Sequence, residues 1–100
     1  MYKVYIEYKV KSNSSSKYIS LLPEIKSTLE FRWGVKQYEV YKATGQEGIY
    51  VEEFLIDNLN NLKEIREVRE SNEENLWIEL SSCIVGGREK VNMWSFQREL

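Results

Sequence analysis

The sequence predicts an α+β fold, in which four antiparallel strands form one sheet and helices cover one of its faces. Residues 2–10 alternate strictly between apolar and mixed side chains, which is the period of a β-strand. Two more extended runs, 35–43 and 49–56, flank a short loop that contains two glycines, and this pattern is typical of a hairpin. Elsewhere apolar residues recur every three or four positions, as they do in helices.

The first strand has one apolar face, on which every second side chain is aliphatic or aromatic. That face carries Tyr2, Val4, Ile6, Tyr8 and Val10. β-branched and aromatic residues are the ones that strands favour. A strand with this pattern has to be covered by other parts of the chain.

The segment after the first strand predicts a helix. Tyr18, Leu22, Ile25 and Leu29 follow helical spacing, and the serines of residues 12–16 offer an N-cap. Pro23 lies inside this pattern, so we expect one bent helix or a late helix start. Gly34 can take the left-handed conformation that ends a helix.

In the predicted hairpin, Tyr38 and Val40 share one face of the second strand. On the third strand the aliphatic residues alternate with polar and aromatic ones, so we assign the aliphatic set to the covered face. This set is Ile49, Val51 and Leu55. The opposite set then faces away from the helices.

Two further helices and a last strand are predicted in the second half of the chain. Leu59, Leu62, Ile65 and Val68 form the apolar stripe of the first of these helices. The second helix is expected to begin at Ser71 with an N-cap, and Gly86–Gly87 is expected to stop it. Residues 91–96 are apolar and extended, which indicates a fourth strand.

The element order is therefore strand, helix, strand, strand, helix pair, strand. Right-handed crossovers place both helical segments on the same face of the sheet. This is the ferredoxin-like topology, with the first and third strands at the centre. Residues 1–100 are enough for one domain with one core.

Composition excludes several functions. The net charge of −2 provides no basic excess for a phosphate backbone, so we expect no nucleic-acid partner. No histidine is present, and this excludes His-dependent triads, zinc sites and haem ligation. We expect no metal and no cofactor. The single cysteine, the lack of a leader-like start and the lack of an apolar run near 20 residues predict a cytoplasmic chain without a membrane span.

The face of the sheet opposite the helices is predicted to be rich in tyrosine and glutamate. It would carry Tyr5, Glu7, Glu39, Tyr41, Tyr50, Glu52 and Phe54, together with Trp94 or Met93. An aromatic face of this size is seldom left to solvent. We therefore predict a homodimer in which two such faces pack against each other, with space between them for a small organic ligand. The ligand-binding candidates are Tyr5, Glu39, Tyr41, Tyr50, Phe54 and Trp94.

Three segments resemble the dimeric α/β-barrel superfamily. They are residues 4–8, residues 48–54, and Gly86–Gly87 followed by residues 91–96. That superfamily includes antibiotic-biosynthesis monooxygenases, haem-degrading monooxygenases and stress-responsive barrel proteins. Many members have a Glu two positions before an aromatic residue on the third strand, and Glu52 and Phe54 match this, with Phe where Trp is commoner. The chain is most similar to small bacterial members without an assigned activity.

The resemblance implies two alternatives to a simple ligand-binding barrel. The first is a cofactor-independent monooxygenase or isomerase, in which Glu7, Glu39 or Glu52 would act as the base if burial raised its pKa, with Glu7 and Glu52 as the catalytic candidates. Haem degradation does not fit, because the His ligand is missing although Asn92 and Trp94 are present. The second alternative is a structural or interaction module, in which the glutamates only pair with neighbouring side chains.

Overall fold

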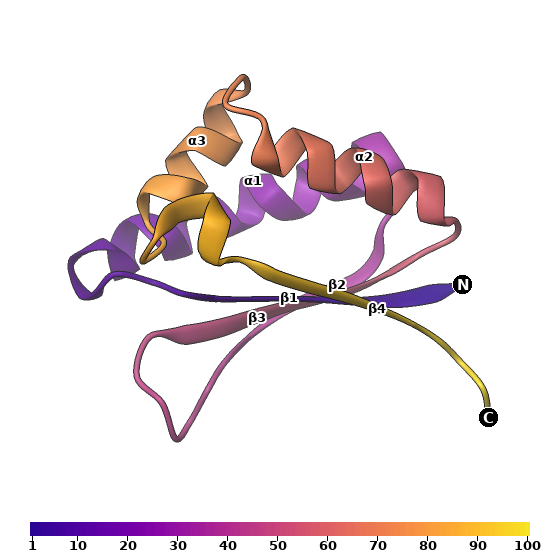
Figure 1. Ribbon diagram of the computed structural model, residues 1–100, viewed down its shortest axis with the longest axis horizontal. Helices are drawn as coiled ribbons and strands as arrows, with labels where there is room; N and C mark the ends of the chain where they lie inside the picture. Colours follow the sequence, from indigo (N-terminus) through magenta and orange to yellow (C-terminus); the bar gives the residue numbers. More distant parts are fainter.

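The computed structural model describes residues 1–100, and in it the helices lie on one face of a four-stranded antiparallel sheet (Figure 1). The sheet order is β2-β3-β1-β4, so β1 and β3 are central as predicted. The strands are β1 Tyr2–Lys9, β2 Lys36–Lys42, β3 Ile49–Ile56 and β4 Asn92–Gln97. The predicted ferredoxin-like topology is confirmed.

The helical layer contains three α-helices and two short 3₁₀ turns. These are α1 Ser15–Trp33, α2 Leu59–Glu70 and α3 Asn75–Ser82, with η1 Ser12–Ser14 and η2 Gly87–Lys90. α1 continues through Pro23, and it ends at Gly34, whose φ of 64° allows its backbone N–H to reach the Glu30 carbonyl. None of the helices combines the length and the apolar character that crossing a bilayer requires.

The start of α3 differs from the prediction. Ser71 does not begin this helix, because it is the C-terminal cap of α2, and its backbone N–H donates to the carbonyl of Glu67. α3 begins four residues later, at Asn75. The serine was therefore correctly recognised as a helix boundary but assigned to the wrong helix.

The core lies between the sheet and the helices. From β1 it takes Val4, Ile6 and Tyr8, which are buried as their alternation predicts. From the helices it takes residues such as Ile25, Leu29 and Ile65, which are fully buried. The opposite face of the sheet has no helix on it, as Figure 1 shows. We call the two sides the covered face and the open face.

The predicted orientation of β3 is wrong. β1 and β3 pair antiparallel with Ile6 opposite Glu52, and paired residues share a face. The covered face of β3 therefore carries Tyr50, Glu52, Phe54 and Ile56, all of them buried. The aliphatic set of Ile49, Val51 and Leu55 lies on the open face instead. Alternation divides a strand into two faces, but only its pairing with β1 decides which one is covered.

An irregularity in β2 helps to form the core. Lys36 pairs with Leu55 and Glu39 pairs with Glu53, so β2 has one residue more than β3 between these two pairs. Gln37 absorbs the extra residue with a φ of 54°. Because of this bulge, Val35 and Tyr38 are both buried although three positions separate them.

Candidate functional site

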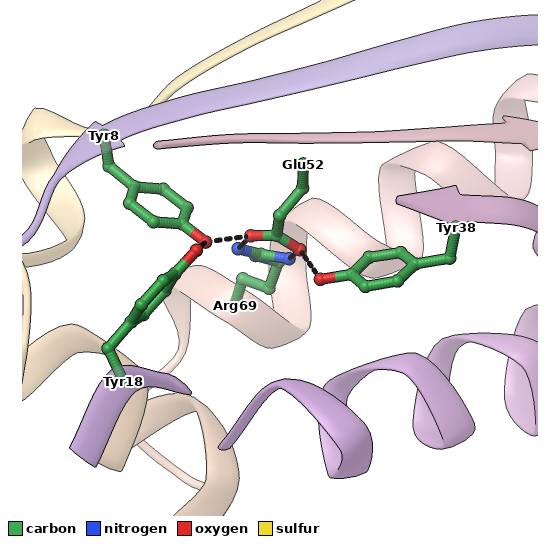
Figure 2. Close-up of polar contacts among 5 residues, drawn as sticks. All are labelled: Tyr8, Tyr18, Tyr38, Glu52 and Arg69. Atoms are coloured by element: carbon green, nitrogen blue, oxygen red, sulfur yellow. Dashed lines mark hydrogen bonds and ion pairs between the residues drawn. The ribbon is translucent and has the colours of Figure 1, made fainter. Parts of the chain in front are cut away.

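The covered face contains a buried polar cluster centred on Glu52, which is fully inaccessible to solvent (Figure 2). Arg69 donates to both carboxylate oxygens, with Nη1 3.1 Å from Oε1 and Nη2 2.6 Å from Oε2. Tyr38 donates to Oε1 and Tyr8 donates to Oε2, each at 2.7 Å. The hydroxyl groups of Tyr8 and Tyr18 also lie 2.7 Å apart. In Figure 2, Tyr8, Tyr38 and Arg69 converge on the carboxylate, and Tyr18 is linked to it through the Tyr8 hydroxyl.

Five different elements supply this cluster. Glu52 comes from β3, Tyr8 from β1, Tyr38 from β2, Tyr18 from the first turn of α1 and Arg69 from the last turn of α2. A cation in the last turn of a helix is favoured, because the carbonyl end of the helix dipole is negative. The guanidinium of Arg69 also stacks over the ring of Trp77, at 5.0 Å from the ring centre. The cluster thus ties the sheet to both α1 and α2.

Glu52 is held in its ionised form. Burial alone would raise the pKa of its carboxyl group, but the charge of Arg69 and the hydrogen bonds from Arg69, Tyr8 and Tyr38 outweigh burial and lower it. Burial and the Glu52 charge raise the pKa values of Tyr8, Tyr18 and Tyr38, so these phenols stay protonated. A general base that works near neutrality needs a raised carboxyl pKa. The arrangement around Glu52 produces the reverse.

The structure separates the residues that the sequence assigned to one site. Tyr50, Glu52 and Phe54 were expected on the open face, and they lie on the covered face because of the β3 register. The Phe54 ring packs near that of Tyr38, with 6.1 Å between the ring centres. Tyr50 packs in the same way against Tyr18, at 4.7 Å. These two residues are part of the core.

The other candidates do share the open face. Tyr5 pairs with Trp94 across β1 and β4, and Glu7 pairs with Asn92. These residues surround a shallow hollow of about 470 Å³, which is lined by Tyr5, Glu7, Val51, Trp94 and Phe96. The Tyr5 and Phe96 rings meet edge to face, with their centres 5.6 Å apart. The Asn92 amide is 3.5 Å from the Glu7 carboxylate.

Glu39 and Tyr41 extend this face toward the edge strand β2. The Tyr41 hydroxyl donates to Glu39 at 3.0 Å, and both residues are exposed. Met93, the alternative to Trp94, points to the covered face, since it pairs with Ile6. Trp94 itself keeps 45% of its surface exposed. The residues assigned from sequence that share the open face are therefore Tyr5, Glu7, Glu39, Tyr41 and Trp94. Glu39 and Tyr41 lie on one edge strand and Trp94 lies on the other, so only Tyr5, Glu7 and Trp94 line the hollow.

Sequence reasoning missed the residues that hold Glu52. The predicted stripe of α2 was spaced three, three and three, and such a spacing drifts around a helix that has 3.6 residues per turn. Leu59, at the start of that stripe, is 50% exposed. The buried stripe is Leu62, Ile65 and Arg69, spaced three and four. An arginine at a core position of the helix is the signal that could have predicted a buried acidic partner.

The remaining acidic residues and Cys83 form no metal site. Cys83 is a free cysteine and is fully buried in the core. No group of three or more carboxylate or thiol side chains is arranged to hold a metal ion.

Comparison with solved structures establishes the fold. An antibiotic biosynthesis monooxygenase aligns with a TM-score of 0.71 at 14% identity, covering 100% of both chains. A conserved protein from Methanosarcina mazei Go1 aligns at 0.74 with 17% identity over 98% of this chain and 92% of that one. A variant of SnoaB, a cofactor-independent oxygenase from Streptomyces nogalater, aligns at 0.73 with 8% identity over 99% and 93%. The chain has their fold.

Sequence comparison adds no closer relationship. No protein-family model matches the chain, and no curated protein sequence matches it either. At identities of 17% and below, the structural similarity says nothing about the reaction or the ligand. The resemblance to the fold of antibiotic-biosynthesis monooxygenases, seen in residues of β1, β3 and β4, is confirmed at the level of the fold.

Proposed function

We propose that the protein is a homodimeric barrel that binds a small aromatic molecule between two packed open faces and performs no chemistry at Glu52. The observation that carries this proposal is the character of the open face. It presents Trp94 and Phe96 at 45% and 55% exposure beside outward-facing aliphatic residues of β3. An apolar patch of this kind, without a helix over it, is typical of an interaction surface.

Symmetry favours a second copy as the partner. A two-fold interface brings the same patch of both chains together, and an apolar patch is complementary to itself. Two sheets stacked face to face lie about 10 Å apart. At that spacing the hollow beside Tyr5 in one chain would be closed by the sheet of the other. The fold of the solved structures is compatible with such an arrangement.

Aromatic ligands suit the hollow because its walls are mostly rings. Tyr5, Trp94 and Phe96 offer faces and edges for stacking, and Glu7 is the one charged group in the lining. A few polar groups in an apolar lining are typical of ligand pockets. We expect the Glu7 carboxylate to accept a hydrogen bond from a phenol or amine of the ligand.

The buried thiol of Cys83 supports a reducing compartment such as the cytoplasm.

Sedimentation velocity tests the assembly. The wild type is expected to sediment as a dimer, at twice the 11.9 kDa mass of the chain, at micromolar concentration. Val51→Lys places a charge in the hollow and should yield a monomer that is still folded by circular dichroism. Val85→Lys is the matched control, because Val85 is 43% exposed and lies outside the sheet. A wild type that remains monomeric at 100-fold higher concentration would refute the dimer.

Fluorescence titration tests the ligand, with 1-naphthol as the probe and naphthalene as its counterpart without a hydroxyl. We expect 1-naphthol to quench Trp94 saturably and Glu7→Gln to weaken its binding about tenfold, the effect of losing one charge-assisted hydrogen bond. Glu79→Gln is the control, since Glu79 lies on α3. A dimer that binds neither probe would support the interaction module and reject the ligand.

The alternative of a cofactor-independent monooxygenase or isomerase requires a base near its substrate. Glu52 does not suit this role, because its pKa is lowered and its four hydrogen bonds leave no oxygen free for a substrate. Glu39 is exposed and does not line the hollow, so Glu7 is the acid that remains beside a ligand there. Oxygen uptake in the presence of 1-naphthol, abolished by Glu7→Gln and retained by Glu79→Gln, would favour the oxygenase.

A further inference from the structure

A second cavity lies on the covered side of the sheet, away from the hollow of the open face. It has a volume of about 100 Å³ and lies between α2, α3, η2 and the start of β4. In Figure 1 these elements meet where the chain turns from α3 into β4. The lining has two parts, a charged one and an apolar one. The charged and polar part consists of Arg66, Arg69, Glu70, Ser81 and Arg88, and the apolar part consists of Trp77, Leu80, Ile84, Val91 and Met93.

Positive charge dominates the lining. Three guanidinium groups face one carboxylate, that of Glu70. Arg69 is already paired with Glu52. The side chains of Arg66 and Arg88 make no ion pair and no hydrogen bond within the chain, although both contribute to the cavity wall. Arginine presents several N–H donors in a planar fork, and this fork matches a carboxylate or phosphate group.

Trp77 provides a second, independent observation at this cavity. Its ring lines the cavity and is 1% exposed, and its indole N–H is buried without an acceptor. It is the one buried side-chain polar atom of the protein that has no hydrogen-bond partner. Buried N–H groups are nearly always paired, because leaving one unpaired is costly. An acceptor in the cavity would satisfy it.

The local backbone supports this arrangement. Gly86 and Gly87 have φ angles of 79° and 65°, so the chain reverses sharply after α3. A side chain at Gly86 would collide with the side chain of Lys90. The two glycines therefore allow η2 to fold back and present Arg88 to the cavity. Residues 86–87 were expected to end α3, but α3 already ends at Ser82 and the two glycines lead into η2.

We propose that this cavity binds a small organic carboxylate, with Arg66 and Arg88 holding the carboxylate and the Trp77 N–H donating to it. The apolar wall of Leu80, Ile84 and Met93 accommodates a short hydrocarbon tail. A volume of 100 Å³ corresponds to about three water molecules, enough for a carboxylate with a few carbon atoms. The apolar half of the lining favours an organic acid over inorganic phosphate.

Nuclear magnetic resonance on the full chain tests the proposal through the indole N–H resonance of Trp77. Butyrate is the probe, and butyramide is its neutral counterpart of the same shape. We expect butyrate to shift the Trp77 resonance saturably and butyramide to leave it in place. The double variant Arg66→Gln/Arg88→Gln should weaken butyrate binding at least about tenfold, because charge-assisted contacts are lost. Both arginines are exposed, so the fold is expected to survive.

Two controls separate a site from general charge effects. Arg98→Gln also removes a positive charge, but this exposed arginine bonds to the carbonyl of Leu100 at the C-terminus, and butyrate affinity should not change. Inorganic phosphate is the second probe. Phosphate binding without butyrate binding would overturn the assignment to a carboxylate. A Trp77 resonance that does not respond to either anion, or an equal butyrate affinity in the double variant, would overturn the site.

Discussion

The two faces of the sheet differ in the kind of residue that the same strands place on them. On the covered face, β3 buries Glu52 and Tyr50 under the helices, where polar groups are costly unless each is paired. On the open face the same strand turns Val51 and Leu55 outward, where nothing in the chain covers them. β3 therefore encloses a charged residue beside Phe54 and Ile56, and it turns two aliphatic residues outward beside Glu53. This difference is the reason for proposing that a second chain covers the open face.

The largest expected effect comes from breaking the buried ion pair of the covered face. Arg69→Met keeps the volume of the side chain but leaves the Glu52 carboxylate without a counter-charge. Removing one partner of a buried pair costs about 3–5 kcal/mol, so the free energy of unfolding should fall by that amount in urea denaturation. Arg66→Met on the same helix is the control and should change stability by less than about 0.5 kcal/mol, since Arg66 is exposed.

A variant that removes both charges tests whether the loss of stability comes from the unpaired carboxylate. The double variant Glu52→Gln/Arg69→Met removes both charges, and an amide at position 52 can still accept from Tyr8 or Tyr38. It should regain much of the stability that Arg69→Met loses. A double variant as unstable as the sum of its single variants would show that packing of Arg69 against Trp77 matters more than the charge pair.

Much of the fold follows from the sequence, but the site does not. Strict alternation placed Val4 and Ile6 correctly, since β1 is the central strand on which the helices rest. β3 has two apolar-looking sets, and local pattern cannot decide between them, because the decision depends on pairing with a strand more than 40 residues away. A glutamate such as Glu52 is normally expected at the surface. It is buried here because it forms an ion pair with Arg69, which lies in a different element. A long-range polar contact of this kind leaves no periodic pattern in the sequence.

Alkaline pH should destabilise the protein through the three buried phenols of the cluster on the covered face. Burial and the Glu52 charge raise the pKa values of Tyr8, Tyr18 and Tyr38 in the folded state, so their contribution is fully present below the ordinary phenol pKa and is lost as pH rises above it. Each such group lowers stability by at most about 1.4 kcal/mol per pH unit. Near the ordinary phenol pKa this full slope is not yet reached, so each contributes about 1 kcal/mol between pH 10 and 11, and the three together contribute about 3 kcal/mol. Urea denaturation across this range measures the slope.

A variant assigns this slope to the cluster. Tyr38→Phe removes one of the three phenols, so its stability should fall less steeply above pH 10 by about a third of the wild-type slope. If Tyr38→Phe lost stability as steeply as the wild type, the alkaline transition would have to come from groups outside the cluster.

Acidic pH should lower the stability less than alkaline pH does, because only one group of the cluster is protonated. Burial alone would raise the pKa of Glu52, but Arg69 and the hydrogen bonds lower it, so the stabilisation is present above the ordinary carboxyl pKa and is lost as pH falls below it. One carboxyl group changes stability by at most about 1.4 kcal/mol per pH unit. The Glu52→Gln variant should therefore have a shallower acid limb below about pH 4.5 than the wild type. Glu79→Gln, which removes only an exposed ion pair with Lys17, serves as the control.

The smallest effect is expected from a conservative change on the open face. Val51→Thr and Val4→Thr are the same substitution on two central strands, one on each face. Val4→Thr buries a hydroxyl group without a partner and should cost about 1–3 kcal/mol at any protein concentration. Val51→Thr should cost less than about 0.5 kcal/mol when the chain is dilute enough to be monomeric, because Val51 is then partly in water.

Protein concentration distinguishes the two faces in this last experiment. Association stabilises the folded chain by mass action, so a variant that dimerises more weakly gains less stability than the wild type as concentration rises. The cost of Val51→Thr should therefore grow between nanomolar and 100 µM protein, while the cost of Val4→Thr stays constant. Thermal unfolding followed by tyrosine and tryptophan fluorescence covers this range. Two costs that are both independent of concentration would mean that the open face faces solvent, and that its aliphatic residues need another explanation.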